Sequence, residues 1–367
     1  MLHLQSLIVN NDNWREILSQ KPYFIDIREN DDLILFKYSQ IESDFNNDLV
    51  RECRGIILYK KDWTIACFPF EKFGNFSESY VPDINWDNVR ILEKLDGSLI
   101  KLFFNKITNK WQWATNGTIN AFDTTLGFDS DKSFGWLIYH TLELMGVDDK
   151  VLLDNLNINY TYLFELCTPL NRVVVPHKDY KLYYLTSKHN ETGYEEVEEL
   201  PWFPTPKSYD FSKLDDIIKA SNELPFDEEG YVVVDNNFQR VKVKSPAYVH
   251  VHHLNNNGVI TKTRVLDLIR INEHKEFLNY YPEYNDIFDE VENGYNNLVS
   301  KLNDDRIRLE EWMKENPESS RKDQALFIKE FSILPGSLFS FLDGKIKNMI
   351  DYIKDMPSDK VINYIGR

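Results

Sequence analysis

A chain of 367 residues with 42% hydrophobic and 14% aromatic residues can bury a sizeable core, which excludes a disordered protein. Its formal net charge of −17 argues against a protein that coats nucleic acid, because neutralising phosphates favours basic surfaces. Net charge describes the whole surface, however, so it remains compatible with a locally basic cleft that grips one or two phosphates.

Between about residues 23 and 254 the chain consists mostly of short apolar or alternating segments bounded by Asn, Asp, Gly and Pro, a pattern typical of β-strands. Helical spacing predicts one helix near residues 136–145 and a second near 211–220. The expected fold class is α+β with mainly antiparallel sheets. The predicted strands are, in chain order, 33–36, 55–59, 98–104, 111–115, 162–166, 181–186 and 231–234.

After the polar stretch at residues 255–258 the pattern changes to helical stripes of apolar residues. The first stripe contains Val265, Leu268 and Ile269. A second runs over residues 287–302 and a third over residues 338–353. We therefore predict a first domain over residues 1–255 and an all-helical domain over residues 256–367.

Targeting and redox signals are sparse. No run of eighteen apolar residues occurs, and the first residues lack the basic-then-apolar layout of a secretory signal. The three cysteines Cys53, Cys67 and Cys167 contain no C-x-x-C pair, which predicts a reducing setting without a disulfide framework or zinc cluster. We expect a cytoplasmic protein, in the host cytoplasm if the chain is viral, with no membrane partner.

Lys94 stands in a K-x-D-G string at residues 94–97. A lysine in such a string can carry a nucleotide as a phosphoramidate on its ε-amine. Attack on phosphorus needs a neutral amine, and free lysine titrates near about 10.4, so the site must lower that pKa by burial or neighbouring cations. Taken alone the string is weak, because an ordinary exposed lysine at a turn produces it as well.

Further strings place acids and cations around this lysine. Glu165 ends an apolar strand, and Glu229 stands at the mouth of another. Lys242 and Lys244 share one face of a strand, since side chains repeat every second residue. Upstream lie Arg54 in E-C-R-G and the string E-K-F at residues 71–73.

These residue types suit a nucleotidyl transferase. Lysine pairs neutralise the charge that grows on phosphate oxygens and on departing pyrophosphate. Glu165 can accept hydrogen bonds from a ribose hydroxyl, and Glu229 can hold a Mg²⁺ hydration shell, because Mg²⁺ keeps several waters. Phe73 can stack on a base.

The order K-x-D-G, F-E, E-G-Y-V and V-K-V-K, preceded by E-C-R-G and E-K-F, is similar to that of the covalent nucleotidyltransferase superfamily of ligases and mRNA capping enzymes. Within it the chain resembles the phage-type RNA ligase 1 family over roughly residues 30 to 255. The strings that carry the resemblance are E-C-R-G-I, E-K-F-x-N, K-x-D-G-S-L, F-E-x-x-x-P-x-N-R-V-V and K-S-x-x-Y-V.

The resemblance implies an adenylyltransferase domain of antiparallel sheets with flanking helices over residues 1–255, and a helical domain over 256–367 that sets RNA specificity. Lys94 would carry AMP, and Glu229 and Glu273 would be associated with a metal. The implied catalytic residues are Lys94, Glu165, Glu229, Lys242, Lys244 and Tyr248. The implied ATP- or adenylate-binding residues are Tyr38, Arg54, Lys72, Phe73, Gly97, Glu165, Lys242 and Lys244.

The implied activity is ATP-dependent joining of 5′-phosphate and 3′-hydroxyl RNA ends through a lysyl-AMP and an RNA-adenylate. ATP and Mg²⁺, with Mn²⁺ as an alternative, would be the cofactors. Broken tRNA-like loops would be the substrate, and a separate kinase-phosphatase would heal the ends. The alternatives are an RNA-end binding module with weak or no sealing, a capping guanylyltransferase, and a DNA ligase. The helical tail disfavours the last two, since a DNA ligase normally carries an OB-fold after the lysine pair.

Asn116 is a departure from the family pattern, which has a lysine in the strand after the nucleophile. If that lysine holds a phosphate, Asn116 offers only a neutral hydrogen bond, which is weaker than a charge-assisted one. We therefore expect other cations, such as Arg172 or Lys101, to supply the missing charge.

Overall fold

The computed structural model describes residues 1–126, 131–196, 200–254, 260–354 and 356–365. The chain divides into two compact units, Met1–His252 and His253–Arg367. The predicted boundary between residues 255 and 256 lies outside the described residues.

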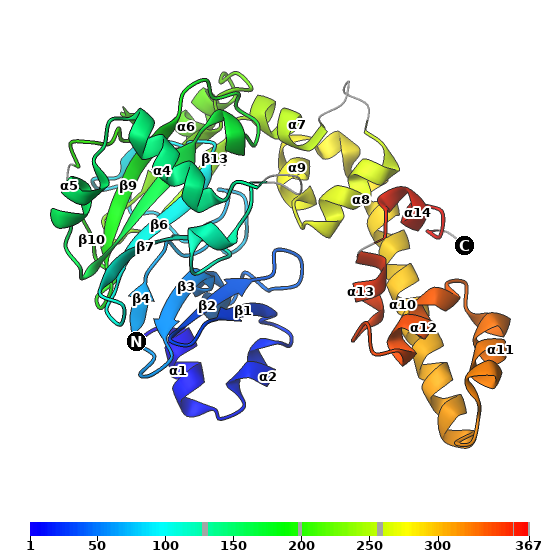
Figure 1. The fold of residues 1–367 in the computed structure, drawn as a ribbon. Helices are drawn as coiled ribbons and strands as arrows, with labels where there is room; N and C mark the ends of the chain where they lie inside the picture. The colour runs from blue at the N-terminus through cyan, green and yellow to red at the C-terminus, as the bar shows by residue number, and fades with distance from the viewer. Residues whose placement is uncertain (127–130, 197–199, 255–259, 355, 366–367) are drawn as a thin grey trace. The chain divides into compact units, whose positions relative to one another are not determined.

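Three antiparallel sheets form the first unit, as Figure 1 shows. They have the strand orders β1-β2-β3-β4, β10-β9-β8-β6-β7 and β11-β5-β12-β13. The strands are β1 (Ile25–Glu29), β2 (Leu33–Tyr38), β3 (Arg54–Tyr59), β4 (Ile65–Cys67), β5 (Arg90–Glu93), β6 (Ser98–Asn105), β7 (Lys110–Thr115), β8 (Tyr160–Cys167), β9 (Lys181–His189), β10 (Glu195–Glu196), β11 (Ser208–Tyr209), β12 (Gly230–Val234) and β13 (Arg240–Lys244). All seven predicted strands are confirmed, as is the α+β class with antiparallel sheets.

Helices cover the outer faces of the sheets. The helices of the first unit are α1 (His3–Asn10), α2 (Trp14–Leu18), α3 (Asp48–Glu52), α4 (Phe134–Leu144), α5 (Asp149–Asp154), α6 (Leu214–Ser221) and α7 (Pro246–Leu254), with short 3-10 turns at Ala121–Asp123 and Pro169–Asn171. The predicted helices near 136–145 and 211–220 correspond to α4 and α6. The helices α1 and α2 bury apolar side chains against one face of the first sheet, and α4 and α5 do so against the five-stranded sheet.

The inner face of the five-stranded sheet has two parts: one packs against the first sheet, and the other lines a cavity. Phe103 and Ala114 pack with Leu35 and Ile57 of the first sheet into one apolar cluster. Leu99 and Glu165, which are cross-strand partners, lie on the same face as Phe103, because side chains alternate along β6. This second part of the face lines a cavity instead of a core.

The third sheet has one apolar face and one cavity face. Val233 and Val243 pack with Ile217 of α6. The alternating residues Val232 and Val234 point to the other side and line the same cavity as Glu165. The period-2 patterns of β12 and β13 thus determine which side chains can meet a ligand.

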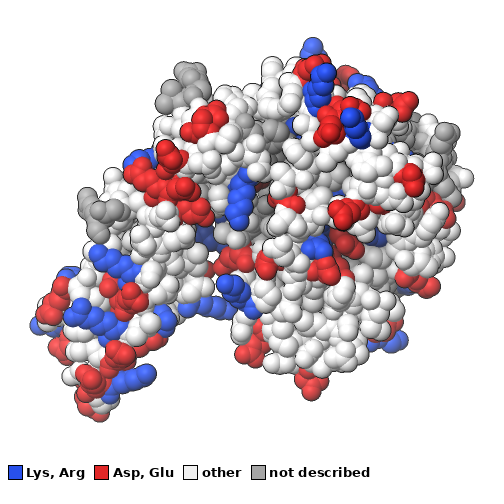
Figure 2. All heavy atoms as spheres, turned by 180° about the vertical axis from the view of Figure 1, so that it is seen from behind, with Lys and Arg blue, Asp and Glu red and all other residues white. Residues whose placement is uncertain are grey.

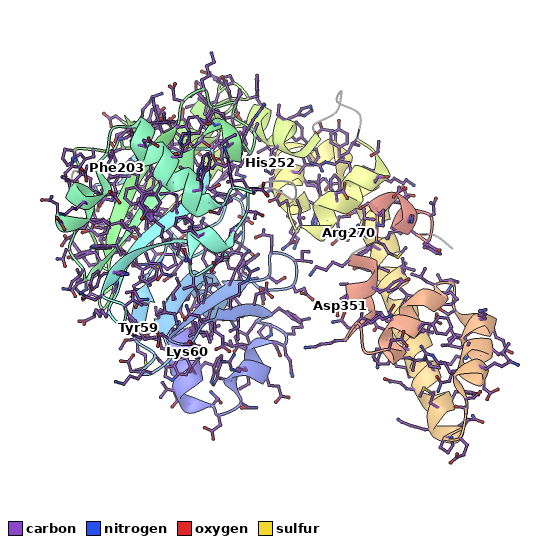
Figure 3. All side chains as sticks on the ribbon, viewed as in Figure 1. Tyr59, Lys60, Phe203, His252, Arg270 and Asp351 are labelled. Atoms are coloured by element: carbon purple, nitrogen blue, oxygen red, sulfur yellow. The ribbon has the colours of Figure 1, made fainter. Side chains whose placement is uncertain are left out.

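The second unit is helical. Its helices are α8 (Lys262–Arg270), α9 (His274–Tyr280), α10 (Asn285–Glu315), α11 (Arg321–Phe331), α12 (Pro335–Leu342), α13 (Met349–Lys354) and α14 (Ser358–Ile362), with a 3-10 turn at Pro282–Tyr284. Arg270 of α8, labelled in Figure 3, donates to the backbone oxygens of Ile353 and Met356 and to Ser358 Oγ, at 2.6, 2.9 and 2.7 Å. It therefore fastens the last two helices to α8.

One helical prediction needs correction. The stripe over residues 338–353 was expected to lie on one helix, but the structure divides it between α12 and α13. Gly344 stands between them with a φ of +66°, a left-handed conformation that ends helices and favours glycine.

Charge is interspersed over the face of the molecule that Figure 2 shows. The face in Figure 2 shows acidic and basic side chains close together, without a broad basic area. Among the described residues, no helix has both the length and the apolar character needed to cross a membrane.

Candidate active site

A cavity of about 620 Å³ lies in the first unit between the five-stranded sheet and the third sheet, and extends to the first sheet. Six cationic side chains and two carboxylates line it, so this cavity is locally basic although the chain is acidic. Its charged lining residues are Arg28, Lys37, Arg54, Arg90, Lys94, Arg240, Glu93 and Glu165.

Lys94 follows directly after β5 and enters the cavity. Its backbone N–H donates to the Gly230 oxygen at 2.8 Å, which prolongs the pairing of β5 with β12. Arg90, Leu92 and Lys94 line the cavity, and so does Glu93 between them. The Lys94 Nζ lies 2.7 Å from Glu229 Oε1.

Glu229 is buried, with 6% of its surface exposed. The Lys244 Nζ lies 3.7 Å from the same Oε1 atom that contacts Lys94. Gly230 has a φ of +136°, and a Cβ there would come within 2.1 Å of the Val243 oxygen. Glycine after Glu229 is thus required for the close approach of β12 and β13, which brings this carboxylate to both lysines.

Lys242 and Lys244 lie on one face of β13, as predicted. Lys242 is opposite Val232, and Lys244 is opposite Gly230. Val232 lines the cavity, so the lysine pair is on the cavity side of the third sheet.

Glu165 lies on β8 across the cavity from this sheet. Burial raises the pKa of Glu165 to about 7; the Lys94 and Arg54 cations oppose the increase, and the Glu229 and Asp96 carboxylates add to it. Near neutral pH the carboxyl group therefore exists in both protonation states, and a cation or hydrogen-bond donor that enters the cavity favours the carboxylate.

Glu165→Gln is expected to change the pH dependence of stability. The folded-state pKa of Glu165 lies above the ordinary value of 4.5, so its contribution is fully present below 4.5 and is lost as pH rises through about 7. The loss is at most about 3 kcal/mol. Urea unfolding of the nucleotide-free protein at about pH 5 and about pH 8 measures this effect. The unfolding free energy of the variant, relative to that of the wild type, should be higher at about pH 8 than at about pH 5. A difference that does not change with pH would contradict the raised pKa.

The K-x-D-G loop packs directly on β8. A Cβ on Gly97 would lie 2.5 Å from the Leu166 oxygen and 2.8 Å from Cys167 Sγ, so only glycine fits. Asn171 donates to Ser98 Oγ at 3.0 Å and to the Leu166 oxygen at 2.7 Å. The P-x-N-R-V-V string thereby holds the loop against the strand that carries Glu165.

Asp96, whose role was not predicted, organises this loop. It is buried, and its Oδ2 accepts hydrogen bonds from the N–H groups of Val174 and Val175 at 2.9 and 2.6 Å. Its Oδ1 accepts one from the hydroxyl of Tyr248 at 2.8 Å. Tyr248 itself is 2% exposed on α7 and is not among the residues that line the cavity. Tyr248 therefore acts on the site through its neighbours, which include Asp96 and Lys244, whose Nζ lies 5.7 Å from the Tyr248 ring centre.

The first sheet contributes Arg54 at the start of β3. The Arg54 guanidinium lies 5.1 Å from the centre of the Phe73 ring, and both residues line the cavity. Tyr38 and Lys72 do not line it. The Lys72 Nζ instead lies 5.4 Å from the Tyr38 ring centre and 4.5 Å from that of Phe45.

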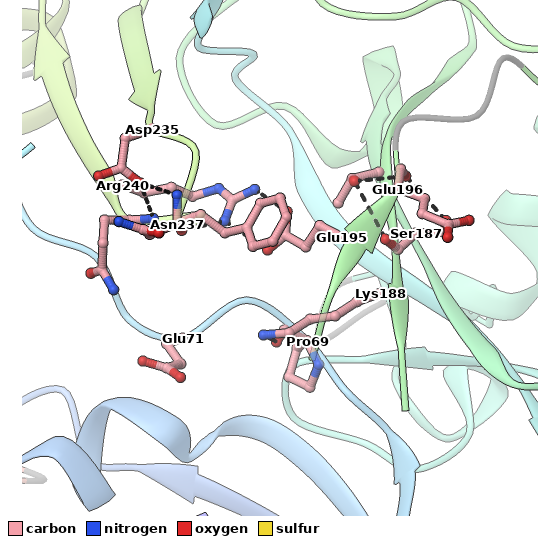
Figure 4. A network of polar contacts seen from close by, with 12 residues as sticks. Pro69, Glu71, Ser187, Lys188, Glu195, Glu196, Asp235, Asn237 and Arg240 are labelled. Carbon is pink, nitrogen blue, oxygen red and sulfur yellow. Dashed lines mark hydrogen bonds and ion pairs between the residues drawn. The ribbon is translucent and has the colours of Figure 1, made fainter. Parts of the chain in front are cut away.

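A second cavity of about 420 Å³ adjoins the first, and Lys72 lines it. Phe70, Phe73 and Arg240 line both cavities and so form the wall between them. Arg240 is held there by a bidentate ion pair with the buried Glu195, and both residues are labelled in Figure 4. The Arg240 guanidinium lies 4.2 Å from the Phe70 ring centre. Lys188 extends from β9 toward Pro69, whose oxygen accepts from its Nζ at 3.4 Å (Figure 4).

The structure brings four unpredicted cations to the main cavity. They are Arg28, Lys37, Arg90 and Arg240. The cations expected from sequence to replace the family lysine do not line it: Lys101 is fully buried, with its Nζ 2.5 Å from the Gly55 oxygen, and the Arg172 Nε donates to the Val174 oxygen at 2.9 Å. For Lys101 that expectation was wrong, because the packing of the first sheet on β6 encloses it; Arg172 is exposed, and its role stays a prediction.

Glu273 belongs to the second unit, where it immediately precedes α9. Its association with a metal remains a prediction. Within the described part of the chain, no group of three or more His, Cys, Asp or Glu side chains could hold a metal by itself. The carboxylates of Glu229 and Glu165 do fit Mg²⁺, which proteins commonly bind through one or two carboxylates together with substrate phosphates and water.

The sequence is similar to those of several known proteins. A family model described as RNA ligase matches residues 52–248. A putative bifunctional polynucleotide kinase/RNA ligase of Autographa californica nuclear polyhedrosis virus is 30% identical over 299 residues, covering 77% of this chain and 42% of that protein. The chain thus spans less than half the length of this relative.

Two further similar proteins are covered over more of their own length. An RNA ligase of Rhodothermus phage RM378 is 26% identical over 405 residues, covering 90% of this chain and 89% of the relative. An archaeal ATP-dependent RNA ligase structure, form 2, has a TM-score of 0.42 at 13% identity, with 78% of each chain covered.

Proposed function

This chain belongs to the RNA ligase family, and from that premise we propose that it joins a 5′-phosphate RNA end to a 3′-hydroxyl end with ATP as the energy source. The observation that carries the proposal is the environment of Lys94. Its Nζ is held 2.7 Å from Glu229 in a cavity that six cationic side chains line. A lysine beside a carboxylate, in a cavity suited to phosphates, has the parts required for nucleotidyl transfer.

In the first proposed step, the Lys94 amine attacks the α-phosphorus of ATP. A P–N bond forms, the P–O bond to the β-phosphate breaks, and pyrophosphate leaves. Glu229 Oε1 is a hydrogen-bonded acceptor for the proton that the ammonium must lose. Arg54, Lys242 and Lys244 would neutralise the charge that develops on the phosphate oxygens.

In the second step, an oxygen of the RNA 5′-phosphate attacks the same phosphorus, so the P–N bond breaks and a 5′-5′ pyrophosphate forms. In the third, the 3′-hydroxyl attacks the 5′-phosphate, a phosphodiester forms, and AMP leaves. Phe73 would stack on the adenine, and Glu165 would accept from a ribose hydroxyl. A Mg²⁺ or Mn²⁺ ion held by Glu229 would supply charge neutralisation.

The choice of RNA is also part of the proposal. We assign it to the helical unit and expect broken tRNA-like loops as substrates. The name of the viral relative includes a polynucleotide kinase, which supports a separate end-healing activity as the partner of this ligase. The three cysteines are free, buried thiols, which supports a reducing, cytoplasmic setting.

The test is incubation of the protein with ATP labelled on its α-phosphate and Mg²⁺, followed by denaturing electrophoresis. We expect label on the chain that acid releases and alkali does not, as a phosphoramidate requires, and less label from GTP. Nicked stem-loop, linear and duplex RNAs then show whether the label is used for sealing. Absence of label overturns the proposal. Label from GTP favours a capping enzyme, and RNA binding without sealing favours an end-binding module.

A further inference from the structure

Two cationic groups converge at one end of the main cavity. A Cβ built on Gly117 would lie 3.7 Å from the Lys37 Nζ and 4.0 Å from an Nη atom of Arg28. All three residues line the cavity, together with Asn116. Because Gly117 has no side chain, the space between the two cations remains open.

Strand pairing explains this convergence. Arg28 pairs with Leu35, and Lys37 pairs with Asp26, so Arg28 and Lys37 are diagonal neighbours on one face of the first sheet. Leu35 packs with Ala114 of β7 in an apolar cluster, which turns this face toward the five-stranded sheet. The strand β7 ends at Thr115, so the bend that contains Asn116 and Gly117 follows beside the two cations.

Neither cation has an ion-pair partner in the part of the chain that the structure describes. No hydrogen bond, ion pair or ring contact links the side chain of Arg28 or Lys37 to another described residue, and Asp26, although opposite Lys37, forms no ion pair with it. The Lys37 Nζ and an Arg28 Nη atom both lie within 4.0 Å of one point beside Gly117, so an anion at that point would be attracted by both.

We propose that Arg28, Lys37 and the Asn116–Gly117 bend form a site for a phosphate group, at the opposite side of the cavity from the third sheet. Phosphate is an anion whose charge and oxygen acceptors match a guanidinium and an ammonium at once. The resemblance predicts a positive charge at position 116, where this chain has Asn116. Arg28 of β1 and Lys37 of β2 would supply that charge instead. The site rests on the proposed function, since it serves the same cavity as Lys94. The phosphate comes either from the β- and γ-positions of ATP or from the 5′ end of RNA.

Direct binding tests the site without catalysis. Calorimetry on the nucleotide-free protein would compare inorganic pyrophosphate, a 5′-phosphorylated oligoribonucleotide and the same oligomer with a 5′-hydroxyl. We expect the double variant, Arg28→Gln with Lys37→Gln, to bind at least one of the phosphate ligands at least about 10-fold more weakly, since charge-assisted hydrogen bonds to phosphate are lost. Loss for pyrophosphate alone identifies ATP as the source, and loss for the 5′-phosphorylated oligomer alone identifies RNA. Loss for both supports a shared site.

Two further variants distinguish binding at this site from a general attraction of anions to positive charge. Gly117→Ala adds a methyl group at ordinary contact distance from both cations, so it should fold normally and weaken the same ligand without changing charge. Lys110→Gln removes an exposed cation at the other end of β7, outside the cavity, and should leave binding unchanged. If the double variant binds every ligand as the wild type does, or if the wild type binds no phosphate ligand, the site is rejected. Neither result depends on the lysyl-AMP step, whose failure would be seen separately as absence of label.

Discussion

Lys94→Arg is expected to abolish the covalent nucleotide. Arginine keeps a cation beside the buried Glu229, whose contact with the Lys94 Nζ is 2.7 Å, but a guanidinium remains protonated and cannot attack phosphorus. We expect the rate of self-labelling with ATP to fall by at least roughly 10⁴-fold, as for other lost nucleophiles. Labelling followed by denaturing electrophoresis measures this directly.

Two measurements support the interpretation of this loss. The unfolding midpoint of Lys94→Arg should stay close to that of the wild type, because the charge pair with Glu229 is kept. RNA that already carries a 5′-adenylate should still be sealed by the variant, since the third step forms no bond to lysine. If label persists in Lys94→Arg, another residue carries the nucleotide and the assignment of Lys94 is wrong.

The sequence predicted the strands that alternate strongly or are continuously apolar. The strands β6, β8 and β12 alternate or are apolar over their whole length, so their period is visible without any neighbour. The strands β1 and β5 were missed because their sequences, I-D-I-R-E and R-I-L-E, are short and largely polar. They are strands because β2 and β12 pair with them, which is tertiary information.

The same distinction applies to the site. Lys94, Glu165 and Glu229 stand in strings whose order is visible in the sequence, and the structure brings these three together. Arg28 and Lys37 belong to no string, and their place in the cavity depends on how the first sheet packs against β7. Lys101 is the opposite case. Its position shortly after the K-x-D-G string suggested a place in the site, but packing buries it completely. The sequence therefore indicated the chemistry, while the packing of the sheets decides which cations reach a ligand.

Asp96→Ala is expected to have the second-largest effect. The Asp96 carboxylate accepts three hydrogen bonds, from the Val174 and Val175 N–H groups and from the Tyr248 hydroxyl. Removing it leaves buried donors without a partner, which should cost roughly 3–5 kcal/mol of unfolding free energy. Lys94 is two residues away on the same loop, so we also expect self-labelling to fall by at least about 100-fold. Urea unfolding and the labelling assay measure the two effects separately.

Tyr248→Phe is the matched control, because it removes one of the three hydrogen bonds and keeps the ring in its buried place. It should cost about 1–2 kcal/mol, and the labelling rate should fall much less than in Asp96→Ala. Tyr248 was predicted to be catalytic, whereas its contact with Asp96 indicates a residue that positions the loop. A direct contact with ATP or RNA would be revealed if Tyr248→Phe lost as much labelling as Asp96→Ala while remaining as stable as the wild type. If instead labelling follows the loss of stability through both variants, the hydroxyl acts by holding the K-x-D-G loop in place.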